Sequence, residues 1–154
     1  EAARFEGAES FTSLVNITKE GDLYAITNEN KLWTANIDGE TKIIDLPELI
    51  QNEKLLIYND SYYISNDNSL ICIKDSDKRV IDFDSRIQEI NLSEGYITVT
   101  TNTSLYLIKD NIIVKGFPIE SDGLFSISDI DYNGKINLVN IRNKSLFNYE
   151  IIED

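Results

Sequence analysis

The sequence contains no histidine and no methionine, and it has one cysteine, Cys72, among its 154 residues. The absence of histidine excludes Ser-His-Asp and Cys-His catalysis and histidine-bound metals, and a lone cysteine excludes intrachain disulfides and zinc clusters. Because Cys72 lies in the apolar run 70–73, we expect a buried strand residue rather than a reactive thiol. A start at Glu1 without any methionine also leads us to expect a piece of a longer or processed protein.

Long apolar runs and positive charges are also scarce. No run approaches the roughly 18 to 20 apolar residues that a membrane-spanning helix needs, so we do not expect the chain to span a bilayer. Lys and Arg number 14 against 27 Asp and Glu, which gives a net charge of −13. Such a surface repels phosphate backbones and anionic lipids, so nucleic-acid binding is not expected and the charge is expected to serve solubility.

What the sequence does have is a repeated pattern of polar turns and apolar strands. Four times an asparagine-led turn is followed by a leucine and a large apolar residue, and the leucines are spaced by 38, 35 and 41 positions. Asn and Asp tolerate left-handed backbone and bond neighbouring amides, so these turns have a physical basis. A strand-like run precedes each turn, at 23–26, 61–64, 96–99 and 136–139. The four leucines are Leu32, Leu70, Leu105 and Leu146.

The strand-like segments predict an all-β fold. They are rich in Ile, Val, Tyr and Thr, and no segment keeps a helical apolar stripe; residues 47–50 could form one helical turn at most. A repeat of about 38 residues with three or four antiparallel strands is typical of β-propeller blades. We therefore expect one β-propeller-like domain over residues 1–154, and a β-sandwich or barrel is the alternative. The domain would consist of a lead-in at 1–13 and repeats at about 14–50, 51–88, 89–123 and 124–154.

Four blades can form a small closed ring or part of a larger propeller. An unclosed part leaves apolar faces and edge strands exposed, so we expect self-association through the blade edges in that case. The runs 55–58 and 112–114 are apolar at consecutive positions. We expect both faces of these runs to be covered by neighbouring sheets.

One loop carries a pattern of possible metal ligands. Asp129, Asp131 and Asn133 place side-chain oxygens at alternate positions, followed by the carbonyl of Lys135 and by Asn137. A hard cation such as Ca²⁺ takes six to eight oxygen ligands, and the glycine at position 134 permits a sharp turn around the ion. The pattern predicts a structural Ca²⁺ site in this loop.

Residues 116–151 resemble the FG-GAP/VCBS type of β-propeller repeat. The resemblance is carried by the segments 116–118, 125–129 and 145–149 around the aspartate loop. Earlier repeats are similar to generic propeller blades of the pyrroloquinoline-quinone-repeat kind, through the segments 23–26 and 31–33. The FG-GAP/VCBS resemblance implies Ca²⁺ bound within the last blade and a secreted or cell-envelope protein.

The loop departs from strong calcium sites in its charge. Asn133 and Asn137 supply oxygen without charge, so two carboxylates remain and the affinity should fall toward about 10⁻⁴–10⁻³ M. An EF-hand is not expected, because Asn140 stands where that motif has a bidentate glutamate and a strand-like run follows. The alternative is an ordinary polar turn without a cation.

Two further groups have ordinary structural explanations. The acidic group alternates with cations and lacks a glycine, so we expect a solvated face: Asp75, Asp77, Asp82 and Asp84. The aromatic group could line a sugar-binding surface, but packing between blades is the commoner role of strand tyrosines: Tyr58, Tyr62 and Tyr63.

These observations favour a non-enzymatic binding or scaffold module of a secreted or cell-envelope protein, whose ligand is a protein or a carbohydrate. The alternative is the propeller portion of a carbohydrate-active enzyme, in which two carboxyls about 5 to 10 Å apart act as acid and base. No pattern in the sequence singles out such a pair. A third hypothesis is a structural domain that completes another chain by strand addition.

Overall fold

A computed structural model describes most of the chain, and all its regular elements are strands. Among the described residues there are fifteen strands and no helix, so the all-β prediction is confirmed. Within this part of the chain, no helix is therefore long and apolar enough to cross a membrane. Residues 1–53 and 54–154 form two compact units, which are described separately. The described residues are 11, 16–18, 21–47, 50, 54–93, 95–119, 125–130, 135–140 and 144–150.

The first unit contains one four-stranded antiparallel sheet. Its strands follow one another in chain order. Phe11 forms an isolated bridge with Thr27, and its ring lies 5.4 Å from the fully buried ring of Trp33. Trp33, the single tryptophan of the chain, therefore packs against Phe11 in the core of this unit. Its strands are β1 (Asn16–Ile17), β2 (Leu23–Ile26), β3 (Lys31–Ala35) and β4 (Thr41–Asp45).

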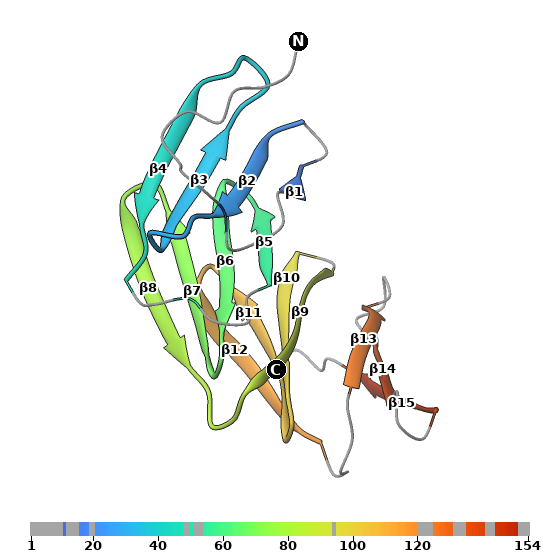
Figure 1. Cartoon of the computed structure of the whole chain (residues 1–154). Coiled ribbons are helices and arrows are strands. Elements are labelled where there is room, and N and C mark those ends of the chain that lie inside the picture. The colour runs from blue at the N-terminus through green and yellow to red at the C-terminus, as the bar shows by residue number, and fades with distance from the viewer. Residues whose placement is uncertain are drawn as a thin grey trace. The chain divides into compact units, whose positions relative to one another are not determined.

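The second unit contains three more antiparallel sheets, each with its strands in chain order (Figure 1). The first two sheets have four strands and the third has three among the residues described. Each of these sheets is a complete meander of consecutive strands, as in a propeller blade, whereas a β-sandwich commonly joins its two sheets by Greek-key connections. The strands are β5 (Leu55–Tyr58), β6 (Ser61–Asn66), β7 (Ser69–Lys74), β8 (Asp77–Asp82), β9 (Ile87–Ser93), β10 (Tyr96–Thr101), β11 (Ser104–Lys109), β12 (Ile112–Pro118), β13 (Phe125–Ile130), β14 (Lys135–Asn140) and β15 (Ser145–Glu150).

The core of the second unit lies between successive sheets. β9 contacts β5 and β6 of the preceding sheet and β13 of the following one. One apolar cluster joins the β5–β8 and β9–β12 sheets and includes Cys72, which is buried as predicted. Tyr63 is buried in this cluster and Tyr58 packs against it, so these two tyrosines pack between the sheets as the commoner alternative predicted. Tyr62 is half-buried.

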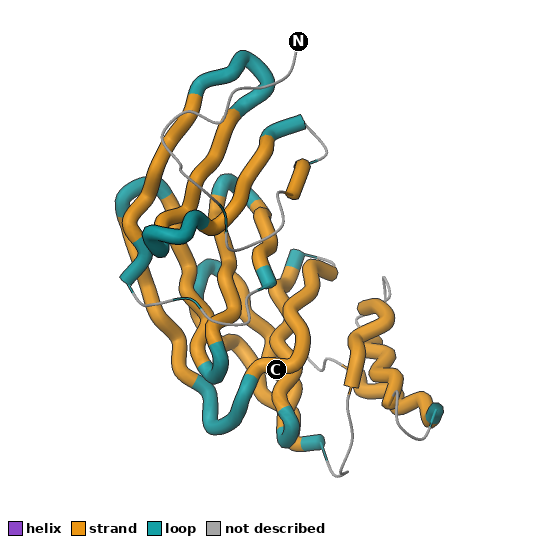
Figure 2. Tube along the Cα trace, in the orientation of Figure 1, coloured by secondary structure: helices purple, strands orange, loops and turns teal. Residues whose placement is uncertain are grey.

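The turns between strands, which are teal in Figure 2, are built largely from Asn and Asp with left-handed backbone. Among the described residues, eight non-glycine residues have positive φ, between 47° and 61°, and seven of them are Asn or Asp. Their short polar side chains make this conformation less costly than it is for other residues. The predicted turn chemistry is thus confirmed. The eight are Asn30, Asn59, Asp60, Asp67, Asp75, Asp110, Asn111 and Lys144.

A backbone hydrogen bond recurs at the end of the three four-stranded sheets. The first residue after the fourth strand donates its N–H to a carbonyl in the turn between the second and third strands. The distance from the donor nitrogen to the carbonyl oxygen is 3.4 Å from Leu46 to Asn30 and 2.8 Å from Phe83 to Asn68. It is 2.7 Å from Ile119 to Thr103. We call this bond the exit tie, because it holds the chain where it leaves each sheet.

The outermost strands β4, β8 and β12 are exposed to solvent. Each is the last strand of its sheet and pairs on one side with β3, β7 and β11, respectively. In β12 the side chains of Ile112, Ile113 and Val114 are 52%, 38% and 51% exposed. The prediction that run 112–114 is covered on both faces is therefore wrong, because these side chains remain exposed on the outermost strand of their sheet. The run 55–58 in β5 is half-buried.

Candidate functional site

The predicted calcium loop lies at the hairpin between β13 and β14. Asp129 and Asn137 are direct cross-strand partners, as are Ile130 and Ile136. The two ends of the predicted ligand set therefore face each other at the base of the loop, and a strand follows the loop where an EF-hand would have a helix. The predicted ligands Asp131 and Asn133, together with Gly134, lie outside the described residues.

The side chains of β14 alternate across the sheet. Ile136 is fully buried, Lys135 is exposed and Asn137 is half-buried. This alternation places Lys135 and Asn137 on the face opposite Ile136, as expected for a strand. No group of three or more His, Cys, Asp or Glu that could hold a metal occurs among the described side chains, which do not include those of Asp129 and Asp131. The Ca²⁺ site therefore remains a prediction.

A second polar site is formed where the turns of the β5–β8 and β9–β12 sheets meet. Three segments contribute to it: the β6–β7 turn, the loop that follows β8 together with the start of β9, and the β10–β11 turn. We call this site the loop rim and define it by its polar residues. They are Asp67, Asn68, Asp84, Ser85, Arg86, Gln88, Asn102 and Thr103.

The loop after β8 is held by the turn of its own sheet. Phe83 donates its N–H to the carbonyl of Asn68, and the Asn68 side-chain amide donates to the carbonyl of Phe83 at 3.2 Å. Four residues later, Ile87 donates its N–H to the carbonyl of Asp67 at 2.7 Å. The segment 84–86 is thus fixed at both ends and projects toward the next sheet.

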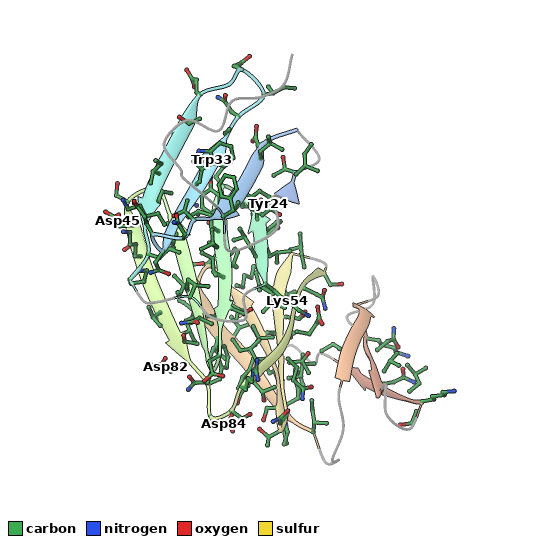
Figure 3. All side chains as sticks on the ribbon, in the orientation of Figure 1. Tyr24, Trp33, Asp45, Lys54, Asp82 and Asp84 are labelled. Atoms are coloured by element: carbon green, nitrogen blue, oxygen red, sulfur yellow. The ribbon has the colours of Figure 1, made fainter. Side chains whose placement is uncertain are left out.

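Asp84 joins this loop to the β9–β12 sheet (Figure 3). Its Oδ1 accepts a hydrogen bond from the Tyr106 hydroxyl at 3.1 Å, and its Oδ2 accepts one from the Thr103 hydroxyl at 3.4 Å. The hydroxyls of Ser85 and Thr103 lie 3.3 Å apart. Burial raises the pKa of Tyr106, and the neighbouring Asp84 carboxylate adds to the rise, so Tyr106 remains a hydrogen-bond donor at neutral pH.

Further polar contacts extend the loop rim to both sides. The Gln88 side-chain amide donates to the Asn102 side-chain carbonyl, and the Arg86 Nε lies 3.6 Å from the Asp67 carboxylate. The Lys54 ammonium also pairs with Glu89 across the same two sheets. The loop rim therefore presents carboxylate, hydroxyl, amide and guanidinium groups, several of which are held by hydrogen bonds, and such a set is suited to binding a polar partner.

Sequence reasoning found only part of this site. The acidic group at 75, 77, 82 and 84 is exposed, so its prediction as a solvated face is confirmed. The additional role of Asp84 was missed, because its partners Thr103 and Tyr106 lie 19 and 22 residues further along, in the next repeat. No signal within one repeat could have identified this contact.

Comparisons with known proteins reveal the fold. No protein-family model and no curated protein matches the chain. Virginiamycin B lyase from Staphylococcus aureus, solved as a catalytically inactive variant with quinupristin, is 14% identical with a TM-score of 0.62, covering 89% of this chain and 54% of that one. BBS1N in complex with ARL6DN is 12% identical with a TM-score of 0.62, covering 93% and 52%. The WD40 β-propeller domain of Doa1 is 13% identical with a TM-score of 0.54, covering 90% and 54%.

These likenesses support the predicted architecture. The chain is built of β-propeller-like blades, and each described sheet corresponds to one blade. The chain spans about half the length of each solved structure named above. At such low identity the comparisons reveal the fold and leave function to be argued from the residues.

Proposed function

We propose that this chain is a non-enzymatic binding or scaffold module of a secreted or cell-envelope protein. The observation that carries the proposal is where the carboxylates lie. Every buried polar side chain that the structure describes is Ser, Thr or Asn, and none of the Asp and Glu side chains in that set is buried. A general acid needs a pKa raised by burial, so the described blades offer a rigid frame with polar loops rather than an acid–base pair.

The loop rim is the proposed binding surface. Residues on loops that a rigid scaffold positions are a common source of binding contacts. Asp84, Thr103 and Tyr106 are held by mutual hydrogen bonds, so little side-chain freedom is lost when a ligand binds. One similar structure, BBS1N, was solved with a protein partner, which supports a protein ligand; the hydroxyl, amide and carboxylate groups would suit a carbohydrate equally.

A screen of the immobilised chain against an oligosaccharide array and against short displayed random peptides tests this proposal. Asn102 is exposed on the loop rim, so Asn102→Arg should weaken the binding of ligands that contact the rim by about tenfold or more. The matched control is Ser76→Arg, an exposed turn residue at the opposite end of the β7–β8 hairpin. Ligands that bind both variants equally, or an absence of ligands in both screens, would contradict the proposal.

The enzymatic alternative is tested by activity. One similar structure is a lyase, but its inactive form is a histidine-to-alanine variant and this chain contains no histidine. We expect no turnover of chromogenic glycosides by the purified chain. Turnover that a single Asp→Asn or Glu→Gln change abolishes would establish the alternative instead.

We further propose that the last blade is of the FG-GAP/VCBS type and binds one structural Ca²⁺. The ligands would be the side chains of Asp129, Asp131, Asn133 and Asn137 and the carbonyl of Lys135. The register that sets Asp129 opposite Asn137 supports a closed loop between them. The ion would tie the ends of the hairpin together and would serve stability rather than reaction.

A melting experiment tests the calcium proposal. Millimolar Ca²⁺ should raise the melting temperature relative to a chelator, because a ligand that binds the folded state stabilises it. Asp129→Ala should remove this increase, and Asp77→Ala, an exposed aspartate on β8, should retain it. Equal melting temperatures of the parent chain in Ca²⁺ and chelator would reject the site.

A further inference from the structure

Among the described residues, the last sheet has three strands where each of the other sheets has four. In the other sheets the fourth strand, β4, β8 or β12, pairs along the outer side of the third strand. The third strand of the last sheet is β15, and no strand that the structure describes lies along its outer side (Figure 1). We call this side of residues 145–150 the β15 edge. It shares no residue with the loop rim, so it is a separate surface.

Leu146 occupies a position that is fully buried in the other sheets. It is the second residue of its strand, as Leu32, Leu70 and Leu105 are of β3, β7 and β11. Those three leucines are 0% exposed, whereas Leu146 is 60% exposed. Asn148, two positions along on the same face, is exposed as well, although its equivalents are buried. The equivalents are Thr34, Cys72 and Leu107. The β15 edge therefore exposes side chains at positions that are covered in a four-stranded sheet.

The β15 edge lacks the features that protect the other outer edges. Exposed cations stand on β4 and β8, at Lys42, Lys78 and Arg79, and a bulge interrupts the ladder between β11 and β12. β15 contains no Lys, Arg or Pro, and its ladder with β14 is continuous. Charges, prolines and bulges on an outer strand prevent unwanted strand pairing, so an edge without them can accept a further strand.

The fourth strands of the other sheets show which sequence fits beside such a third strand. The residue opposite the leucine is large, apolar and half-buried in each sheet, and the residue two positions before it is a cation. The apolar residues are Ile44, Ile81 and Phe117, and the cations are Lys42, Arg79 and Lys115. Each cation lies opposite the position that Asn148 occupies in β15. We call this order of a cation, any residue and a large apolar residue the fourth-strand pattern.

The charge of β15 favours an added strand with this pattern. β15 ends with Glu150, whereas β7 and β11 end with Lys74 and Lys109. A cation opposite Asn148 would therefore stand at the position diagonal to Glu150, and opposite charges on neighbouring strands attract. A second copy of β15 fits less well, because β15 contains no cation to complete the pattern.

We infer that the β15 edge accepts one antiparallel strand from a partner polypeptide that carries the fourth-strand pattern. The apolar residue of that strand would lie opposite Leu146 and its cation opposite Asn148. Main-chain hydrogen bonds along an edge supply affinity, and the side-chain pairs supply selectivity. This partner is recognised as an extended strand, so its binding is separate from that of a polar ligand on the loop rim.

A synthetic peptide with the sequence of residues 75–83 provides the probe, because it contains β8 and the pattern at 79–81. Its binding to the full chain is measured by fluorescence anisotropy of an attached fluorophore. Hydrogen exchange should show that the amides of 145–150 gain protection when the peptide binds, while those of the loop rim do not. The matched control peptide carries Ile81→Asp and should bind at least about tenfold more weakly.

Variants of the chain test the side-chain pairs. Asn148→Glu should strengthen binding and Asn148→Lys should weaken it, each by about two- to fivefold, because a cross-strand charge pair changes sign between them. High salt should reduce both effects. Leu146→Lys should weaken binding by about tenfold or more, and Ile37→Lys, an exposed isoleucine in the β3–β4 turn, should leave it unchanged.

Four results would overturn the inference. They are no saturable binding of the peptide, peptide binding without added protection at 145–150, changes of the same sign in the two Asn148 variants, and amides of 145–150 that are all protected already in the free chain. The last result would show that another part of the chain occupies the edge. Protection that grows with the concentration of the chain alone would identify a second copy as the occupant and would also overturn the inference.

Discussion

Tyr106 contacts two separate parts of the chain through one side chain. Its hydroxyl donates to Asp84, and its ring lies 4.9 Å from that of Phe83. The ring also covers Gly116, its cross-strand partner on β12, where an added Cβ would lie 3.2 Å from ring carbons. Tyr106 therefore links the loop leaving one sheet to the outer strands of the next.

Substitutions of Tyr106 should separate the hydroxyl from the ring. Tyr106→Phe removes the bond to the exposed Asp84 and should lower the free energy of unfolding by about 0.5–1 kcal/mol. Tyr106→Ala also removes the ring contacts with Phe83 and Gly116, and should cost about 2–3 kcal/mol. Urea denaturation measures both values. Equal losses in the two variants would show that the ring contributes nothing beyond its hydroxyl.

Cys72 should make the stability of the second unit depend on alkaline pH. Burial raises the pKa of Cys72 from 9.0 to about 12, although its cross-strand partner Arg79 lowers it slightly. Between these values the unfolded thiol loses its proton while the folded thiol keeps it, so stability falls as the pH rises. Denaturation from pH 8 to 11 should show a shallower fall for Cys72→Ala than for the parent chain. Parallel curves would mean that Cys72 is not desolvated.

At the scale of the strands and turns, local sequence patterns correctly predicted which segments form strands and which form turns. The segment 23–26 was expected as a strand and is β2, and the expected polar turns contain the left-handed Asn and Asp residues. These features depend on side chains and the backbone within a few residues of them. Strand and turn identity could therefore be derived from the sequence.

Contacts between repeats could not be derived in the same way. The apolar run 112–114 is compatible with a covered strand and with an outermost one, because strand order is decided by the whole sheet. Nothing in the sequence distinguishes Asp84 from other exposed aspartates, because its partner Tyr106 is brought beside it only by the fold. For the aspartate loop, only the facing positions of Asp129 and Asn137 are described.

The charges on β8 should prevent edge association. Lys78 and Arg79 are exposed on this outermost strand, which pairs with β7 on one side. Replacing both with isoleucine should cause light scattering on concentration, although the net charge becomes more negative. A double glutamine variant, which loses the same charges without gaining apolar surface, should remain clear. If the glutamine variant also scatters light, the association is caused by the loss of the two positive charges and not by the added apolar surface.

At the scale of the whole molecule, each compact unit contains a unique reporter. Trp33, the single tryptophan, is fully buried in residues 1–53, and Cys72, the single cysteine, is buried in residues 54–154. The apolar cluster that joins two sheets lies entirely in the second unit. The first unit contains one described sheet and should therefore be the less stable.

We expect the two reporters to lose protection at different urea concentrations. Trp33 fluorescence should change first, and thiol labelling of Cys72 should accelerate at higher urea, because each unit unfolds as its own cooperative element. Circular dichroism, which detects the strands of both units, should span the two transitions. Coincident transitions for Trp33 and Cys72 would show instead that the chain unfolds as one cooperative structure.

The exit tie has a consequence for how such a chain can change in length. Leu46, Phe83 and Ile119 each bond back to a turn of the sheet that has just been completed. All the strand pairs of each four-stranded sheet are thus formed within one continuous segment, before the chain enters the next sheet. Duplication or deletion of a segment bounded by two such residues would add or remove a whole sheet and leave the ladders of its neighbours intact.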